Sequence, residues 1–387
     1  MHKYVLKRLL MLIPVILGVT FVVFFILNLA PGDPAAIILG DQATAEALAM
    51  KREELGLNDP IFIRYFHYMR DLLHGSLGVP YKNSIPVWDQ VIMRLPNTAI
   101  LATAGILVAL LIGIPIGIIS AKKQYSLLDN VSMVFALIGV SMPNFWSGLL
   151  LVMLFSLTLG WLPSQGMASG FGPMLKSLIL PALTLGFNSA AMVARMTRSS
   201  MLEVIRQDYI STARAKGDDE RTITFQHMLK NALIPIITAV GLQFGNLLGG
   251  AMLAETIFSW PGLGRLMVES IKSKDIPMVL GCVIFLATMF TLVNLMVDII
   301  YAFVDPRINL QERTVSHMQE QNKPVNNPAV EEKKQRSLWQ EAWRRFRKNR
   351  MAMIGLAFIL LLVIISISTL VIDAATHNSI YNEFVVK

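Results

Sequence analysis

The chain has 387 residues, of which 54% are hydrophobic and only 16% are charged, and its mean hydropathy is +0.55. This balance excludes an ordinary soluble domain of this length and indicates an integral membrane protein. A single cysteine, Cys282, excludes a disulfide scaffold, and the net charge of +8 calls for either an anionic partner or a membrane topology that explains it.

Apolar runs predict six transmembrane helices within residues 1–310, and therefore an all-α, polytopic membrane domain. The first run follows Lys3, Lys7 and Arg8, and no small-residue cleavage site follows it, so we expect a retained helix rather than a signal peptide. The third run is interrupted at Pro143. The expected spans are residues 9–29, 97–121, 131–159, 174–192, 233–258 and 278–303.

A long polar region, residues 33–95, separates the first two spans. Its pattern predicts a helix from Ala45 to Leu55 that Gly56 closes, and an amphipathic helix from Ile61 to Leu73. An amphipathic helix beside a membrane can lie on the lipid interface, cover a partner or pack on its own bundle. The sequence leaves these three alternatives open.

The C-terminal part has a different composition. Residues 311–337 are rich in Gln, Asn, Glu and Lys and indicate a polar linker. Residues 338–387 begin with a basic segment and contain one further apolar run, residues 351–372, which predicts a seventh transmembrane helix.

The basic residues predict the orientation. With the N-terminus in the cytoplasm, 23 of the 34 Lys and Arg residues fall on the cytoplasmic side of the expected spans. This excess has the sign of the positive-inside rule. The net charge is therefore explained by topology, and we expect membrane lipid, not nucleic acid, as the surrounding partner.

Several spans carry residues that lipid alone would disfavour. Gly241, Gly245 and Gly249 form one face of the fifth span, a pattern typical of close helix packing. The polar residues of the last two spans are Gln243, Asn246, Asn294 and Asp298. They either line a polar translocation path or form hydrogen bonds between helices. No chain of acids and histidines suitable for a proton relay accompanies them.

The sequence contains no recognisable catalytic or metal-binding pattern. It has no phosphate-binding G-x-x-x-x-G-K-[ST] loop, and its six histidines are scattered without cysteine partners or an H-E-x-x-H pair. We therefore predict no catalytic residues, no metal site and no cofactor bound by this chain.

A polar stretch, residues 195–235, separates the fourth and fifth spans on the predicted cytoplasmic side. We expect a helix from Met201 to Ala215 that Gly217 terminates in a tight turn, because glycine adopts positive φ at little cost. Asp218 or Asp219 can cap the next helix, with Glu220 in its first turn. Such a rigid turn is suited to docking in a groove of another protein; the alternative is a solvated connecting loop.

Motifs in this stretch and elsewhere resemble the permease subunits of peptide-type ABC importers, a resemblance that covers about residues 1–310. It is most similar to the first of the two membrane subunits of a dipeptide or oligopeptide importer. The motifs are APGDP at 30–34, RMTRSSMLEV at 195–204, DYISTARAKG at 208–217, NALIP at 231–235, ETIFSWPGLG at 255–264 and DPR at 305–307.

The resemblance implies a bacterial inner-membrane importer that works by alternating access. It implies a second permease subunit, two ATPase subunits that use ATP and Mg²⁺, and an extracytoplasmic solute-binding protein. It also makes residues 208–217 the coupling helix that sits in an ATPase cleft. The residues carried over are Asp208, Tyr209, Thr212, Ala213, Arg214, Ala215, Lys216 and Gly217.

This stretch departs from the general family pattern at two points. Ser211-Thr212-Ala213 stands where that pattern has Glu-Ala-Ala, and three acids, Asp218 to Glu220, replace an apolar start of the next helix. Related permeases serve nickel, glutathione or other small solutes, which remain alternative substrates. A stand-alone secondary transporter and a membrane scaffold or receptor are the alternatives from other classes.

The tail has a resemblance of its own. Residues 337–356, SLWQEAWRRFRKNRMAMIGL, are similar to the beginning of the second permease subunit of the same importers. Only the first span of that subunit is present, so we interpret residues 338–387 as its truncated beginning. A seventh helix with a role of its own is the alternative.

Overall fold

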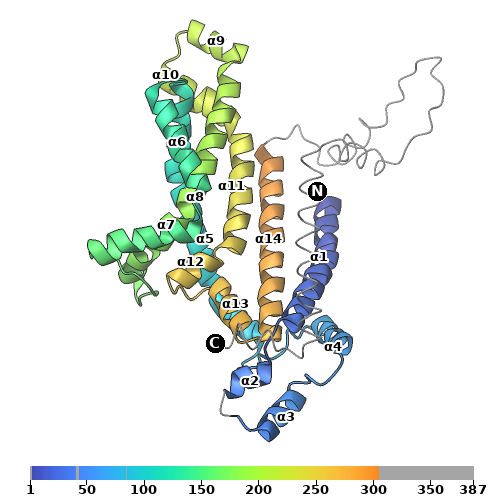
Figure 1. The fold of residues 1–387 in the computed structure, drawn as a ribbon. Coiled ribbons are helices and arrows are strands. Elements are labelled where there is room, and N and C mark those ends of the chain that lie inside the picture. Colours follow the sequence, from blue (N-terminus) through green and yellow to red (C-terminus); the bar gives the residue numbers. More distant parts are fainter. Residues whose placement is uncertain (1, 41–42, 84, 305–387) are drawn as a thin grey trace, which may run out of the picture. The chain divides into compact units, whose positions relative to one another are not determined.

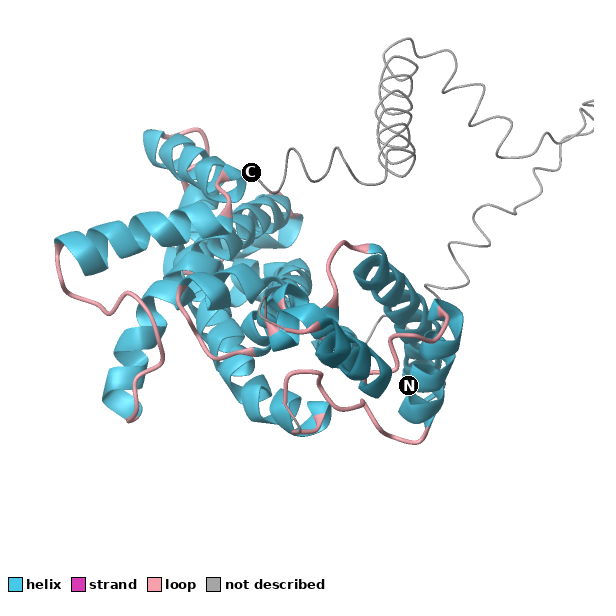
Figure 2. Cartoon of the chain, turned by 60° about the horizontal axis from the view of Figure 1, so that its bottom comes forward, coloured by secondary structure: helices cyan, strands magenta, loops and turns pink. Residues whose placement is uncertain are grey.

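The computed structural model describes residues 2–40, 43–83 and 85–304, and every regular element in these ranges is helical (Figures 1 and 2). The expected all-α class is therefore confirmed for the described part. The linker at 311–337 and the expected seventh helix lie outside it. The elements are α1 (His2–Leu29), α2 (Pro34–Leu39), α3 (Ala45–Glu54), α4 (Ile61–Leu73), α5 (Val87–Lys122), α6 (Leu127–Ser141), α7 (Asn144–Leu151), η1 (Val152–Thr158), α8 (Phe171–Ile205), α9 (Asp208–Ala215), α10 (Glu220–Thr222), η2 (Ile223–Leu229), α11 (Lys230–Gly250), α12 (Met252–Ile257), α13 (Leu263–Lys272) and α14 (Ile276–Val304).

Within the described residues, five helical segments are long and apolar enough to cross a membrane. Helix α6 and the α7–η1 segment lie where the third span, residues 131–159, is expected. They meet at an angle of 105° and pass the same test together, so the count becomes six if this bent pair is one span. The five continuous segments are Val5–Leu29, Val87–Lys122, Phe171–Ile205, Glu220–Gly249 and Ile276–Ile300.

At three places the helices have other bounds than the expected spans. Helix α5 begins at Val87 rather than at residue 97, because Pro96 lies inside the helix instead of starting it. Helix α8 continues to Ile205 rather than ending at residue 192, so part of the basic stretch belongs to the bundle. Helix α11 ends at Gly250, and residues predicted to complete its span form the separate helix α12.

The centre of the bundle is the packing of α5 on α8, which glycine makes possible. A Cβ atom on Gly117 would lie 2.5 Å from Cβ of Thr197, and one on Gly113 would lie 2.7 Å from the carbonyl oxygen of Ala190. Neither distance is possible for real atoms, so only glycine allows the two backbones to approach this closely.

The bend between α6 and α7 follows from Pro143. Proline has no backbone N–H to donate to the carbonyl four residues earlier, which here is that of Gly139. The side-chain amide of Asn188, on α8, donates to this carbonyl over 3.1 Å. A neighbouring helix therefore satisfies the group that the proline leaves open, and this makes a sharp bend tolerable among apolar helices.

Candidate functional site

The predicted coupling segment, residues 208–217, forms a short separate helix rather than the end of a longer one. The expected helix from Met201 to Ala215 is wrong, because α8 ends at Ile205 and α9 begins at Asp208. The chain turns between them so that Ile210 is fully buried with Met201 and Ile223. A straight continuation of α8 would carry Ile210 away from this cluster.

Helix α9 is fixed to the bundle on one side and free on the other. Ile210 and Ala213 are buried, whereas the remaining residues of the coupling segment are exposed, and the Tyr209 side chain is 44% exposed. Figure 1 shows α9 at one end of the bundle, beyond α10. The exposed residues are Asp208, Tyr209, Ser211, Thr212, Arg214, Ala215, Lys216 and Gly217.

The turn after α9 is built as the sequence indicates. Gly217 has φ of +89°, and its N–H donates to the carbonyl of Arg214 over 3.0 Å. A Cβ at Gly217 would meet nothing within 4 Å, so positive φ alone requires glycine here. Asp219 caps α10 by accepting from the N–H of Arg221.

The three acids of this turn are engaged within the chain. Glu220 pairs with Arg214 at 2.8 Å, and Asp218 lies 3.5 Å from Nε2 of His227. A hydrogen bond from Thr222 lowers the pKa of Asp219. The acids therefore stiffen the turn between α9 and α10, which explains why they can replace an apolar helix start.

A buried ion pair lies close to this end of the bundle. Asp129 is 1% exposed and accepts two hydrogen bonds from Arg198, Nε to Oδ1 and Nη2 to Oδ2, both of 2.7 Å. It also accepts from the hydroxyl of Ser120 and from the N–H of Tyr125. The cluster ties the ends of α5, α6 and α8 together. Sequence analysis missed it, and the only signal was an acid inside the apolar start of α6.

Three of the four candidate path residues line one cavity, and the fourth does not. Gln243 and Asn246 line a cavity of about 540 Å³ between α8, α11 and α14, where the amide of Asn246 donates to Oε1 of Gln243 over 3.3 Å. Asp298 also lines it and pairs with Arg8 of α1 at 2.9 Å. Asn294 is not among the lining residues. The other lining residues are Met192, Met196, Ile234, Pro235, Thr238, Ala239, Leu242 and Val297.

The three candidate packing glycines are not equivalent. A Cβ on Gly241 would lie 2.2 Å from Cγ2 of Val297, and one on Gly245 would lie 3.1 Å from the ring of Phe290. Both contacts are with α14. Gly249 has nothing within 4 Å and lies beyond this close approach.

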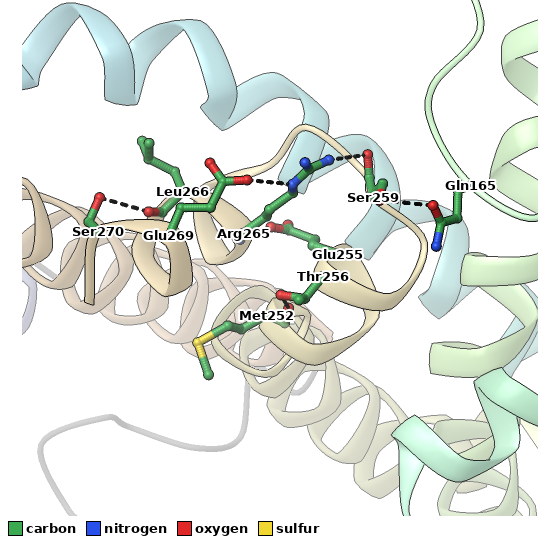
Figure 3. Close-up of polar contacts among 9 residues, drawn as sticks. All are labelled: Gln165, Met252, Glu255, Thr256, Ser259, Arg265, Leu266, Glu269 and Ser270. Carbon is green, nitrogen blue, oxygen red and sulfur yellow. Dashed lines mark hydrogen bonds and ion pairs between the residues drawn. The ribbon is translucent and has the colours of Figure 1, made fainter. Parts of the chain in front are cut away.

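The motif at residues 255–264 forms a buried node on α12 and α13, toward the end of the bundle opposite to α9 (Figure 1). Figure 3 shows Glu255 of this node beside Arg265 and Ser259. Glu255 is fully buried and accepts from the hydroxyl of Thr98 over 2.7 Å and from the N–H of Arg265 over 2.9 Å. Its burial raises the pKa of its carboxyl group. The guanidinium of Arg265 turns away from it and binds Glu269 and the carbonyl of Ser259.

The contacts of this node fix α12 and α13 against the first part of α5. A Cβ on Gly262 would lie 2.3 Å from the carboxyl carbon of Glu255, so the chain can wrap around the acid only with glycine there. The indole of Trp260, fully buried, donates to the carbonyl of Asn97 over 2.9 Å. Within the described residues, no three His, Cys, Asp or Glu side chains form a group that could hold a metal ion.

Comparison with known proteins adds family models that match most of the chain. The model of the binding-protein-dependent transport system inner membrane component matches residues 113–310, and the model of the N-terminal part of such components matches residues 1–102. A third model, the N-terminal transmembrane domain of oligopeptide transport permease C, matches residues 337–381.

The chain is also similar to curated proteins over almost their whole length. The dipeptide transport system permease protein DppB of Alkalihalophilus pseudofirmus is 45% identical over 331 residues, covering 80% of this chain and 99% of the relative. DppB of Escherichia coli K12 is 40% identical over 335 residues, with the same coverage of both chains. The glutathione transport system permease protein GsiC of Salmonella choleraesuis is 43% identical over 308 residues, again covering 80% and 99%. Among solved structures, a chain of the inward-facing MetNI methionine ABC transporter matches with a TM-score of 0.47 and 18% identity, covering 58% of this chain and 100% of that one.

Proposed function

The chain belongs to the family of binding-protein-dependent transport system inner membrane components, and on this premise we propose that it carries dipeptides through the membrane. It is a permease subunit of an ABC importer. The dipeptide substrate is supported by the similarity to two bacterial dipeptide permeases. We assign no catalytic step and no bound cofactor to this chain.

The proposed machine needs partners that supply energy and substrate. We propose a second permease that completes the pathway, two ATPase subunits that hydrolyse ATP with Mg²⁺, and a solute-binding protein outside the cytoplasmic membrane. We place residues 208–217 and the start of α1 on the cytoplasmic side. The charge distribution supports this orientation, and Arg8 near the start of α1 pairs with Asp298 near the end of α14, as alternating spans require.

The observation that carries the proposal is the anchored, exposed helix α9. Because Ile210 and Ala213 are buried while the rest of the segment is exposed, a push on α9 from an ATPase is passed to the cluster of Met201, Ile223 and Ile118. These residues lie on α8, η2 and α5. Closure of the ATPase pair would thereby move the helices that border the cavity with Gln243 and Asn246, which is the physical content of alternating access.

Replacement of Gly217 by valine tests the coupling role. A β-branched residue at this positive φ costs about 1–3 kcal/mol in backbone strain, so α9 would lose its docked position. Since each 1.4 kcal/mol is about tenfold, we expect dipeptide uptake to fall by about 5-fold to 100-fold while the chain stays in the membrane at its normal level. Gly217→Asn is the matched control, because asparagine tolerates positive φ. Undiminished uptake by Gly217→Val would refute the coupling assignment.

Glutathione is the second candidate substrate, because a glutathione permease is as similar to the chain as the dipeptide permeases are. Competition separates the two. Cells with the complete importer should take up a labelled dipeptide, and an excess of unlabelled dipeptide should suppress this uptake more strongly than glutathione does. The reverse order of suppression would assign glutathione.

A further inference from the structure

Helix α4 has two apolar faces, and its neighbours cover only one of them. Ile61, Tyr65, Tyr68 and Leu72 face inward and pack against α1 and the start of α14. Phe62, Phe66 and Leu73 lie within about 40° of one another on a different side, at 3.6 residues per turn. We call these three residues the outer stripe of α4. Their exposed fractions are 67%, 69% and 87%.

The outer stripe is continuous with the surface of α1. The ring of Phe62 lies 5.2 Å from that of Phe25, and the inward-facing Tyr65 makes an edge contact of 5.5 Å with Phe21. Over Val5–Leu29, α1 is an apolar span whose most hydrophobic window is only 11% buried within the chain. A membrane-spanning helix with so much free apolar surface faces lipid. The outer stripe of α4 therefore continues the lipid-facing surface of α1.

The contacts also set the depth of α4. Phe25 and Phe21 precede the end of α1 at Leu29 by four and eight residues, or about 6 and 12 Å along the helix axis at 1.5 Å per residue. Amphipathic interfacial helices bury their apolar face about 5–10 Å into the boundary between headgroups and acyl chains. The position of α4 beside α1 matches this depth.

Cationic residues gather where α1 ends. Arg52, Arg64 and Lys274 line a cavity of about 350 Å³ next to Asn28 of α1. Arg52 pairs there with the single acid, Asp33, and the buried ammonium of Lys274 donates to two backbone carbonyls at the end of α1, which leaves Arg64 as the cation of this group without an acidic partner in the cavity. Arg64 comes from the inward side of α4, away from the outer stripe. Basic side chains at the end of a span and an aromatic stripe slightly deeper are the arrangement that fits a phospholipid boundary.

We propose that α4 is an interfacial helix whose outer stripe lies among the acyl chains of the membrane leaflet at the end opposite to α9. Its partner is the lipid surface, with the headgroups at the level of Arg52, Arg64 and Lys274. The polar side of α4, which carries His67 and Asp71, faces water. Of the alternatives that the sequence left open for this helix, the proposal selects the membrane interface.

Spin labels on α4 test the proposal in the assembled importer reconstituted into phospholipid vesicles. Cys282 is the single cysteine of the chain, so the background variant Cys282→Ala leaves the introduced cysteine as the labelling site of this subunit. Labels are then attached to Phe66→Cys and Leu73→Cys. His67→Cys and Asp71→Cys are the matched controls, because both exposed positions lie at least 100° around the helix from the outer stripe. Collision with oxygen, which concentrates in acyl chains, is compared with collision with a water-soluble nickel chelate.

We expect the ratio of oxygen to nickel collision to be several-fold higher at positions 66 and 73 than at positions 67 and 71. A higher nickel collision at 66 and 73 would place the stripe in water. Weak collision with both reagents would place it under another protein chain, such as the solute-binding protein. Either of these results overturns the proposal, and neither depends on which substrate the importer carries.

Discussion

Two buried carboxylates stabilise the two ends of the bundle in different ways. Asp129, near α9, is neutralised by the guanidinium of Arg198 through two hydrogen bonds of 2.7 Å. Glu255, in the node at the other end, is held by the hydroxyl of Thr98 and the backbone N–H of Arg265, which are neutral donors. An ion pair between helices therefore stabilises the end near α9. At the other end, backbone and hydroxyl groups surround the buried carboxyl group of Glu255.

The difference teaches where each end is vulnerable. Removal of one member of a buried ion pair leaves an uncompensated charge, whereas removal of one neutral hydrogen bond leaves only an unsatisfied polar group. The end near the coupling segment should therefore depend strongly on two single side chains. The opposite end should be less sensitive to substitution and more sensitive to pH.

The largest expected effect follows from Asp129→Ala. Arg198 then stays partly buried without its partner, and the free energy of unfolding should fall by about 3–5 kcal/mol. Unfolding in detergent measures this. The double variant Asp129→Leu with Arg198→Met removes both charges and should recover part of the loss, because the hydroxyl of Ser120 and the N–H of Tyr125 still lack their acceptor. A double variant no more stable than the single one would show that the pair does not act through its charge.

A smaller effect is expected for Glu255→Gln, which keeps the size of the side chain. The amide nitrogen cannot accept from Thr98 or from the N–H of Arg265, so the cost should be about 1–3 kcal/mol. The same unfolding experiment measures it. Glu269→Gln is the matched control. Glu269 is the exposed partner of Arg265, so this variant should change the free energy of unfolding little. A loss as large as that of Asp129→Ala would remove the distinction between the two ends.

The pH dependence sharpens the comparison further. Because burial raises the pKa of Glu255 above its unfolded value, the folded state holds its proton at pH values where the unfolded chain has lost it. This contribution to stability is fully present below the unfolded pKa of about 4.3 and is lost as pH rises through the folded pKa. The stability advantage of the native chain over Glu255→Gln should therefore shrink as pH rises through this window. If the free energies of unfolding of the native chain and of Glu255→Gln changed with pH in the same way, this prediction would be contradicted.

The smallest effect is expected for the pair of Arg8 and Asp298, whose side chains are 44% and 33% exposed. Partly exposed ion pairs contribute about 0–1 kcal/mol, so Arg8→Met should lower the free energy of unfolding by no more than this. Its unfolding can be measured beside that of Asp129→Ala. A loss equal to that of Asp129→Ala would mean that burial is not what separates the two pairs.

Local signals predicted much of the fold. The apolar runs gave the spans, and glycine or proline at the ends placed α3 and α4 almost to the residue. Long-range contacts account for what was missed. Helix α8 can continue past residue 192 because Arg198 meets an acid 69 positions earlier in the chain, and no local pattern records that contact.

The candidate sites show the same limit. The turn at Gly217 and the cap at Asp219 were predictable because both depend on neighbouring residues. The break between α8 and α9 was not, because it arises from the burial of Ile210 among residues of other helices. The glycine pattern predicted a close approach but not where it ends, since a Cβ on Gly249 would meet nothing within 4 Å.

Pro143 and Asn188 act on the same group, the carbonyl of Gly139, so the effect of replacing one depends on whether the other is present. The amide of Asn188 occupies the place of the N–H that position 143 lacks. A lineage that loses Asn188 first passes through an intermediate with an open carbonyl in an apolar setting, whereas one that loses Pro143 first does not. The order of the two replacements therefore matters, and an asparagine at 188 should persist for as long as a proline is retained at 143.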